Sequence, residues 1–266
     1  MIEIGIGIGI NAAPSVALWT PVQVTTAAWF DASDISTVTQ NNNLVSFWGD
    51  KSGNGNNAIQ STGSQQPTTG SSTINGLNTI TFNGANSTHL EALNSASLNI
   101  DGIDKRCFVC VINSGPYVNR GSAYNAVFAK GELSNADVGY GIRLENDNDL
   151  TLKLGANLIE APSDDYTGQN LLYSGLYDSI TTDEELYING ALDDSSTGTS
   201  GASNNTSPLT LGGDSTSSRY FSGDIGELVI FDGEYREKIE GYLAWKFGLQ
   251  ASLPSNHRYK NGPPTI

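Results

Sequence analysis

The residues best suited to chemistry in this chain are three acids spaced two apart: Glu145, Asp147 and Asp149. Hydrolysis of a glycosidic bond uses two carboxylates about 5 to 9 Å apart, one protonated and one ionised. Acids at this spacing share a face only when all of them lie on one strand. Here they lie between the apolar runs 141–144 and 150–154, so we interpret them as solvated acids in a hairpin turn. The chain is therefore predicted not to be an enzyme.

A second group of oxygen-bearing side chains lies in the Gly-rich segment 50–56. Its glycines allow Asp50 and Asn54 to turn inward together, and Ca²⁺ prefers such hard oxygen ligands. Lys51 would oppose a cation, and the same residues form a turn held by internal side-chain to backbone hydrogen bonds. Asp50 and Asn54 are the candidate calcium ligands, and no other cofactor is expected.

Sugar binding would require an exposed aromatic ring beside polar groups that bind hydroxyls. Four tyrosines lie in or next to polar loops and are the candidate glycan-binding residues: Tyr117, Tyr124, Tyr166 and Tyr220. The remaining polar candidates have structural interpretations. His89 and His257 are expected to be surface or structural histidines, and Cys107 and Cys110 to be buried thiols on opposite faces of one strand.

The N-terminus has a strict period of two, with isoleucine on one face of the predicted strand and mostly glycine on the other. One interpretation is a first strand of the domain's own sheet, and the other is an arm that adds to a neighbouring subunit. A linker-like segment, 11–14, follows it. The predicted assembly residues are Ile2, Ile4, Ile6, Ile8 and Ile10.

Short apolar segments separated by Gly, Asn, Ser and Asp predict an all-β chain, an antiparallel two-sheet sandwich. The Asn189-Gly190 step predicts a tight hairpin, because both residues tolerate a positive φ. Two polar stretches, 52–73 and 193–207, are expected to be surface loops. The other predicted strands are 79–82, 106–112, 140–144, 150–154, 171–177, 209–211 and 226–231.

One helix is expected over 233–247, with Asp232 as its N-cap and Gly248 at its end. The apolar stripe that should face the sandwich comprises Tyr235, Ile239, Tyr242 and Leu243. The predicted organisation is an N-terminal arm and linker over 1–26, one domain over 27–253 and an extended tail over 254–266.

The composition argues against two classes of partner. The 266 residues contain 13 Lys and Arg against 28 Asp and Glu, a formal net charge of −15. Nucleic-acid affinity depends on basic side chains that displace counterions from phosphates, so nucleic acid is not an expected partner. No apolar run reaches the roughly 20 residues that span a bilayer, so membrane insertion is not expected either.

Several segments together resemble a known family. The stretches 29–34 (WFDASD), 45–56 (VSFWGDKSGNGN) and 74–82 resemble the opening of laminin-G-like, concanavalin-A-like jelly-roll domains. The stretches 223–231 and 240–249 look like the closing strand and helix of the bacterial and bacteriophage members. The resemblance spans about residues 27 to 253 and implies two antiparallel sheets packed face to face, without implying an activity.

The arm and the jelly roll together favour a bacteriophage virion structural protein of the head, tail or fibre. Such a protein is made in the host cytoplasm and then joins other virion subunits, here as an expected homo-oligomer assembled through the arm. Its outward loops would bind host-surface glycan. The alternatives are a free-standing carbohydrate-binding module and, less favoured, a glycan hydrolase.

Overall fold

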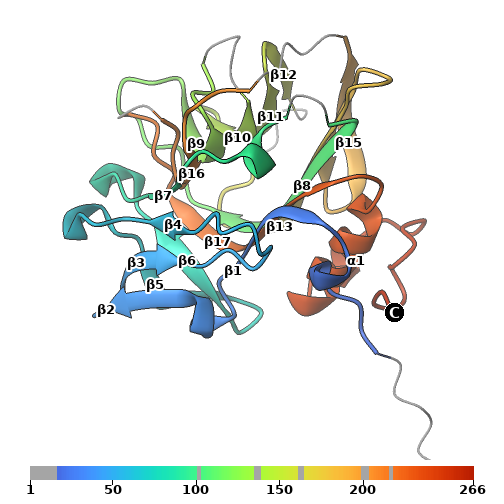
Figure 1. The fold of residues 1–266 in the computed structure, drawn as a ribbon, viewed down its shortest axis with the longest axis horizontal. Helices are drawn as coiled ribbons and strands as arrows, with labels where there is room; N and C mark the ends of the chain where they lie inside the picture. The colour runs from blue at the N-terminus through green and yellow to red at the C-terminus, as the bar shows by residue number, and fades with distance from the viewer. Residues whose placement is uncertain (1–16, 101–102, 135–138, 161–164, 199–203, 216–217) are drawn as a thin grey trace, which may run out of the picture.

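The structure, a computed structural model, describes residues 17–100, 103–134, 139–160, 165–198, 204–215 and 218–266. The predicted assembly residues Ile2, Ile4, Ile6, Ile8 and Ile10 lie outside the described residues. The described part of the chain forms seventeen strands, one α-helix and several short 3-10 helices (Figure 1). The helix is α1 (Arg236–Lys246), and the strands in chain order are β1 Thr26–Asp31, β2 Val38–Asn41, β3 Leu44–Trp48, β4 Ala58–Ile59, β5 Thr68–Ile74, β6 Leu77–Phe82, β7 Leu90–Ala92, β8 Lys105–Ser114, β9 Tyr124–Lys130, β10 Tyr140–Glu145, β11 Leu150–Leu154, β12 Asn157–Glu160, β13 Asn170–Asp178, β14 Asp183–Ile188, β15 Ala191–Thr197, β16 Leu209–Leu211 and β17 Gly223–Asp232.

The strands form two antiparallel layers, which confirms the all-β, antiparallel jelly-roll sandwich. One layer runs β6–β17–β8–β13–β14–β15, with β1 beside the second half of β17. The other runs β4–β7–β16–β9–β10–β11–β12. At one edge β3 pairs with both β4 and β5, which joins the two layers.

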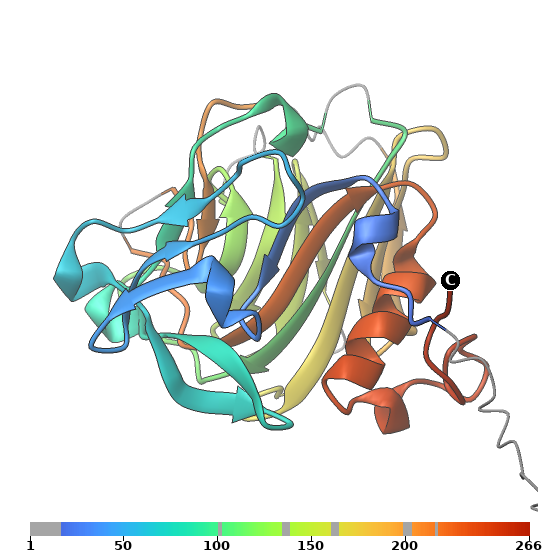
Figure 2. The same cartoon turned by 60° about the horizontal axis from the view of Figure 1, so that its bottom comes forward.

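The central strand β8 shows how the sequence positions the rest. Its alternate residues Phe108, Cys110 and Ile112 face the core between the sheets, whereas Cys107 and Val109 face α1. The two thiols are therefore buried, free and on opposite sides of the sheet, as predicted. The helix packs on the outer face of this layer, against β8 and β13 (Figure 2).

Most predicted strands are confirmed, including the hairpin between β14 and β15, where Asn189 and Gly190 have φ of 51° and 76°. The prediction that 52–73 and 193–207 are loops was wrong in part, because β4 and most of β5 lie in the first stretch and part of β15 lies in the second. The helix prediction was wrong at its start, because α1 begins at Arg236 and not at Gly233. Asp232 is not its N-cap: it ends β17 and forms an ion pair with the buried Arg106 at 2.7 Å. Tyr235 is 42 % exposed and does not join the buried stripe.

Both chain ends of the described part differ from the predicted organisation. Residues 254–266 are not an extended tail: they fold in turns against α1, where the Trp245 indole donates a hydrogen bond to the Tyr259 carbonyl at 2.8 Å. Leu18 pairs with Thr265 in an isolated β-bridge, and Trp19 is buried. The folded unit therefore includes residues assigned to the linker and the tail. Within the described ranges, no helix has the length and apolar character needed to cross a membrane.

Candidate functional site

A groove runs beside the first half of α1, over the outer faces of β13, β14 and β15. It consists of three pockets of about 520, 270 and 300 Å³ that share lining residues. Lys105 and Glu234 line both the first and the second pocket, whereas Tyr187, Arg236 and Glu237 line both the second and the third. We call this continuous depression the α1 groove.

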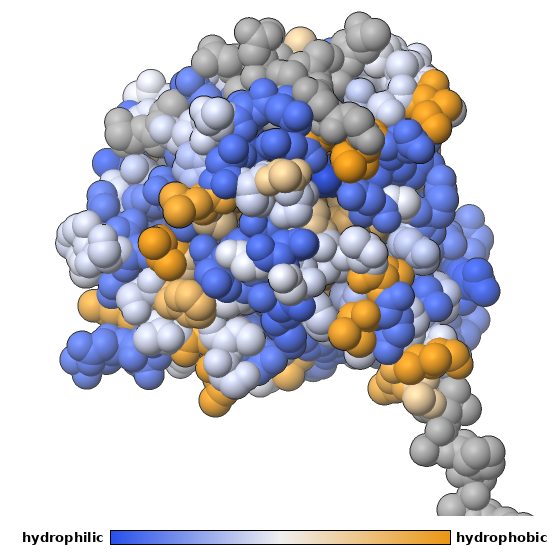
Figure 3. Space-filling view, viewed as in Figure 1, coloured by the Kyte–Doolittle hydropathy of each residue, from blue (hydrophilic) through white to orange (hydrophobic). Residues whose placement is uncertain are grey.

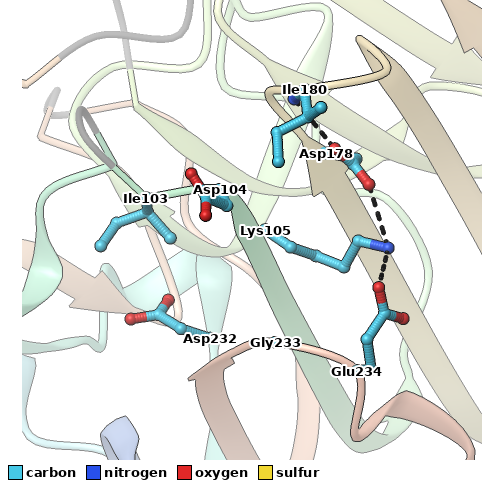
Figure 4. Close-up of a pocket in the computed structure, with 8 residues that line it drawn as sticks. All are labelled: Ile103, Asp104, Lys105, Asp178, Ile180, Asp232, Gly233 and Glu234. Atoms are coloured by element: carbon cyan, nitrogen blue, oxygen red, sulfur yellow. Dashed lines mark hydrogen bonds and ion pairs between the residues drawn. The ribbon is translucent and has the colours of Figure 1, made fainter.

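The first pocket is lined mainly by charged side chains (Figure 4). The Lys105 ammonium lies 3.0 Å from the Asp178 carboxylate and 2.5 Å from that of Glu234. Asp104 and Ile103 lie at the opposite end of the pocket from Asp178 and Glu234. The pocket therefore offers both carboxylate acceptors and an ammonium donor around one space.

Asp178 is held in its ionised form. Burial alone would raise its pKa, but the hydrogen bonds from Lys105 and from the amides of Thr181 and Ile180 lower the pKa overall. Lys105 behaves correspondingly: burial disfavours its charge, but hydrogen bonds to Glu234 and Asp178 raise its pKa. This pair is a fixed set of charges that can orient hydroxyl groups.

The middle of the groove contains an aromatic ring. The Arg236 guanidinium carbon lies 3.5 Å from the centroid of the Tyr187 ring, and the Tyr187 hydroxyl donates a hydrogen bond to Glu185 at 2.7 Å. Period-two alternation in β14 explains this placement: Glu184, Leu186 and Ile188 face the core, so Glu185 and Tyr187 face outward. A partly exposed ring beside charged groups can stack on a sugar while its neighbours bind the hydroxyls.

The third pocket connects the groove to the C-terminal segment. Exposed Asn256 and buried His257 line it together with Leu192. His257 Nε2 lies 3.2 Å from Oε2 of the buried Glu240, which also receives hydrogen bonds from Arg236 and from the Ser174 hydroxyl. Burial alone would raise the pKa of Glu240, but His257, Arg236 and Ser174 lower it overall. This network fixes Arg236 under the groove.

Asp50 forms the side-chain to backbone hydrogen bonds of the turn interpretation, and its binding of calcium stays a prediction. Its two carboxylate oxygens accept four hydrogen bonds, from the amides of Trp29, Ser52 and Asn56 and from the Ser52 hydroxyl. Asn54 directs its amide nitrogen, a donor, at the carbonyls of residues 26 and 27. Lone pairs already used by donors cannot also bind a cation. Among the described residues, no three His, Cys, Asp or Glu side chains form a group suited to a metal ion.

The expectation that the four candidate tyrosines are exposed is wrong for three of them. Tyr124, Tyr166 and Tyr220 are buried, and Tyr117 is half-buried against the core. The Tyr124 ring lies between Arg143 and Arg219, at 3.9 and 4.8 Å, and its hydroxyl donates to Asp214. A position next to a polar loop in the sequence does not reveal that side chains from other segments bury a ring. Glycan contact by Tyr117 stays a prediction.

The acids at 145–149 do lie at a hairpin turn, between β10 and β11, where the amide of Glu145 donates to the Asp149 carbonyl. The expectation that they are solvated is wrong for Asp149, which is 6 % exposed. Burial raises the pKa of Asp149 to about 6, and the nearby Asp147, Asp193 and Glu160 add to the effect. Glu145 instead forms an ion pair with Arg143 at 2.7 Å.

The residues that form the α1 groove were not identified from the sequence. Asp178, Tyr187 and Arg236 lie on three separate elements, and only the pairing of β13 with β14 and the packing of α1 bring them together. The sequence signal is weak: three acids come first in 183–188, and only Leu186 and Ile188, on either side of Tyr187, place the Tyr187 ring on the opposite face of the strand.

Comparison with known proteins identifies a matching family model and several structures of similar fold. Residues 117–238 match the family model described as the concanavalin A-like lectin/glucanases superfamily. This range includes β13, β14, β17 and Arg236, so it contains most of the α1 groove. A comparison with curated proteins gives no match.

Several solved structures share the fold. An arabinofuranosidase complexed with arabinofuranosyl-α-1,2-xylobiose aligns with a TM-score of 0.56 and 15 % identity, over 74 % of this chain and 50 % of that one. The binding domain of Paraclostridial Mosquitocidal Protein 1 aligns at 0.55 and 17 %, over 76 % and 50 %. Botulinum neurotoxin type C, described as entering cells through two ganglioside molecules, aligns at 0.53 and 14 %, over 79 % and 48 %.

These likenesses show the fold alone, and this chain spans about half the length of those proteins. The chain thus has a lectin/glucanase-like jelly-roll fold, and its residues 117–238 match the concanavalin A-like lectin/glucanases superfamily.

Proposed function

We propose that the protein is a carbohydrate-binding module that holds a glycan in the α1 groove without cleaving it. The observation that carries this proposal is the Tyr187 ring, stacked with Arg236 in the middle of a groove lined with carboxylates. An aromatic ring with polar groups on both sides matches the surface of a sugar, which has apolar C–H faces and hydroxyls at its edges.

The same groups argue for binding and not for hydrolysis. Glycoside hydrolysis needs one carboxyl group that stays protonated near neutral pH. Asp178 and Glu234 share Lys105 as their ion-pair partner, and the pKa of Asp178 is lowered. Asp178 is therefore suited to accept hydrogen bonds from hydroxyls and unsuited to donate a proton to a leaving group.

A glycan array probed with the fluorescently labelled full chain tests this proposal. We expect retention on a subset of glycans, followed by saturable binding in calorimetry and no change in the glycan's chromatographic profile after incubation. Absence of binding to every glycan would overturn the binding proposal. Release of a shorter glycan would overturn the non-catalytic part alone.

We further propose that the chain is a structural component of a bacteriophage particle, in its head, tail or fibre, made in the host cytoplasm. The observation that favours this role is the alternation of isoleucine and glycine over residues 2–10, which suits strand addition between virion subunits and a homo-oligomer. Detection of the chain's peptides in purified particles by mass spectrometry tests the location.

Light scattering at matched concentration tests the assembly. We expect the full chain to associate and a chain starting at Ser15 to be monomeric, with cooperative melting kept in both. The same loss of association is expected for Ile6→Asp, because a charge would enter the buried isoleucine face. Equal masses for the full and shortened chains would contradict assembly through the arm.

A further inference from the structure

A second, mainly apolar groove lies where the two ends of the described chain meet. Its cavity of about 340 Å³ is lined chiefly by Leu18, Trp19, Tyr242, Trp245, Pro263 and Pro264. We call it the terminal groove. It lies at the C-terminal half of α1, whereas the α1 groove follows the N-terminal half.

The rim of the terminal groove exposes apolar side chains. Leu18, which lines the groove, is 61 % exposed, and Ile266, whose amide donates to the Ala17 carbonyl, is 72 % exposed. Val22, two residues after the lining residue Thr20, is 70 % exposed. Figure 3 shows apolar surface gathered beside the first described residues. Exposed apolar side chains grouped around a cavity mark a surface that binds another apolar surface.

Several polar groups of this groove are already engaged, which leaves few of them for a sugar. The Trp245 indole nitrogen donates to the Tyr259 carbonyl at 2.8 Å. Lys246 forms ion pairs with Glu227 at 2.5 Å and with Asp31 at 2.8 Å, and the Thr20 hydroxyl donates to Gln23. Such a site favours aliphatic side chains, because it is lined mainly by aromatic rings and prolines.

We infer that the terminal groove receives the isoleucine face of residues 2–10 from a second copy of this chain. The chain carries sixteen residues before Ala17, and it enters the fold at the rim of this groove, through the hydrogen bond from the Trp19 amide to the Pro264 carbonyl. Residues 2–10 are the isoleucine-rich part of that segment, and an extended segment 11–16 spans at most about 20 Å.

The position of the groove beside the chain's own entry point favours exchange between two copies. Residues 2–10 are separated from this entry point by only the short segment 11–16. When two copies place their terminal grooves face to face about a two-fold axis, this reach brings each arm to the partner's groove, in a self-complementary contact. The inference rests on the assembly part of the proposed function and adds the docking surface to it.

The test uses two full-length chains that differ in mass. One carries a photo-crosslinking phenylalanine analogue in place of Ile6, and the other is labelled uniformly with ¹⁵N. After mixing, irradiation and proteolysis, we expect crosslinked peptides that join the arm to ¹⁵N-labelled segments 242–245 and 263–264. Crosslinks to these segments within the same chain, or to other surfaces of the second copy, would overturn the inference.

Substitutions at the rim give an independent measurement. Leu18→Asp and Val22→Asp are expected to weaken association by about tenfold or more, because they place a charge at an apolar contact. Leu93→Asp is the matched control, since Leu93 is 77 % exposed and lies beyond β7, and it should leave the mass unchanged. Association unaffected by both rim variants but lost with Ile6→Asp would overturn the docking surface while leaving assembly through the arm intact.

Discussion

The guanidinium of Arg236 stacks on the ring of Tyr187, with 3.5 Å between the guanidinium carbon and the ring centroid. Arg236 comes from α1 and Tyr187 from β14, so this contact joins the helix to the outer face of the sheet. The contact also fixes the orientation of the Tyr187 ring, whose partly exposed surface remains available to a ligand. The contact between Tyr187 and Arg236 in the middle of the α1 groove is therefore already formed before any glycan binds.

Replacement of Tyr187 should test directly whether its ring binds the glycan. Tyr187→Ala is expected to weaken glycan binding by about tenfold, the equivalent of roughly 1.4 kcal/mol, because the stacking surface is lost. Tyr187→Phe keeps the ring and should stay within about threefold of the unchanged protein. The control is Tyr235→Ala, on an exposed ring that lines none of the three pockets of the α1 groove. Calorimetry with a glycan identified on the array measures all three, and equal affinities for the Tyr187 and Tyr235 alanine variants would contradict the assignment.

The buried carboxylate of Glu240 should contribute strongly to stability. It accepts hydrogen bonds from Arg236 and Ser174 and lies 3.2 Å from His257. Glu240→Ala leaves Arg236 and His257 without this partner, so we expect a loss of about 3 to 5 kcal/mol in the free energy of unfolding. Urea denaturation measures it. Glu237→Ala, at an exposed position of the same helix, should change stability by less than about 0.5 kcal/mol, and similar losses for the two variants would refute the role of the network.

Asp149 should make stability depend on pH. Its pKa of about 6 in the folded protein lies above its ordinary value of 3.8, so the folded state holds this proton more tightly. The resulting stabilisation is complete below about pH 4 and is lost as the pH rises through 6, which amounts to about 3 kcal/mol. Asp149→Asn removes this ionisation, so the variant should show a smaller fall in stability than the unchanged protein between pH 4 and pH 7.5. Denaturant titrations at both pH values measure it, and parallel curves would contradict the raised pKa.

Gly248 should be hard to replace at the end of α1. Its φ of +70° disfavours a side chain, and a Cβ there would lie 2.5 Å from the Asn75 amide. We expect Gly248→Ala to cost about 1 to 3 kcal/mol. Gly53→Ala is the matched control, because Gly53 has a φ of +87° but no atoms within 4 Å of the added carbon. A thermal melt should show the larger loss for Gly248→Ala, and equal losses would mean that the contact with Asn75 does not matter.

The fold could be predicted largely from local patterns. Strands such as β8, β11 and β16 are apolar runs bounded by turn residues, and Asn189-Gly190 specifies its hairpin by backbone conformation alone. The start of α1 was harder, because the acid that looked like a cap is the partner of Arg106, a residue far away in the sequence. Local capping preference was outweighed there by a buried charge that needed a partner.

The candidate site was much less predictable, for two physical reasons. Polar-loop sequence around Tyr124 and Tyr220 suggested exposure, but arginine and histidine side chains from other segments cover their rings. The α1 groove, conversely, depends on strand pairing and helix packing that bring Asp178, Tyr187 and Arg236 together. Neither kind of long-range contact produces a residue spacing that can be recognised in the sequence.

The bridge between Leu18 and Thr265 makes the fold nearly a closed ring. A short peptide joining residue 266 to residue 17 would cross only the distance already bridged by the hydrogen bond from Ile266 to Ala17, which is 3.1 Å between nitrogen and oxygen. New chain termini could then be introduced at a surface turn such as Gly53, which is distant in the sequence from residues 17 and 266. The jelly roll is therefore a candidate for circular permutation, in which the order of its strands along the chain changes while their pairing stays the same.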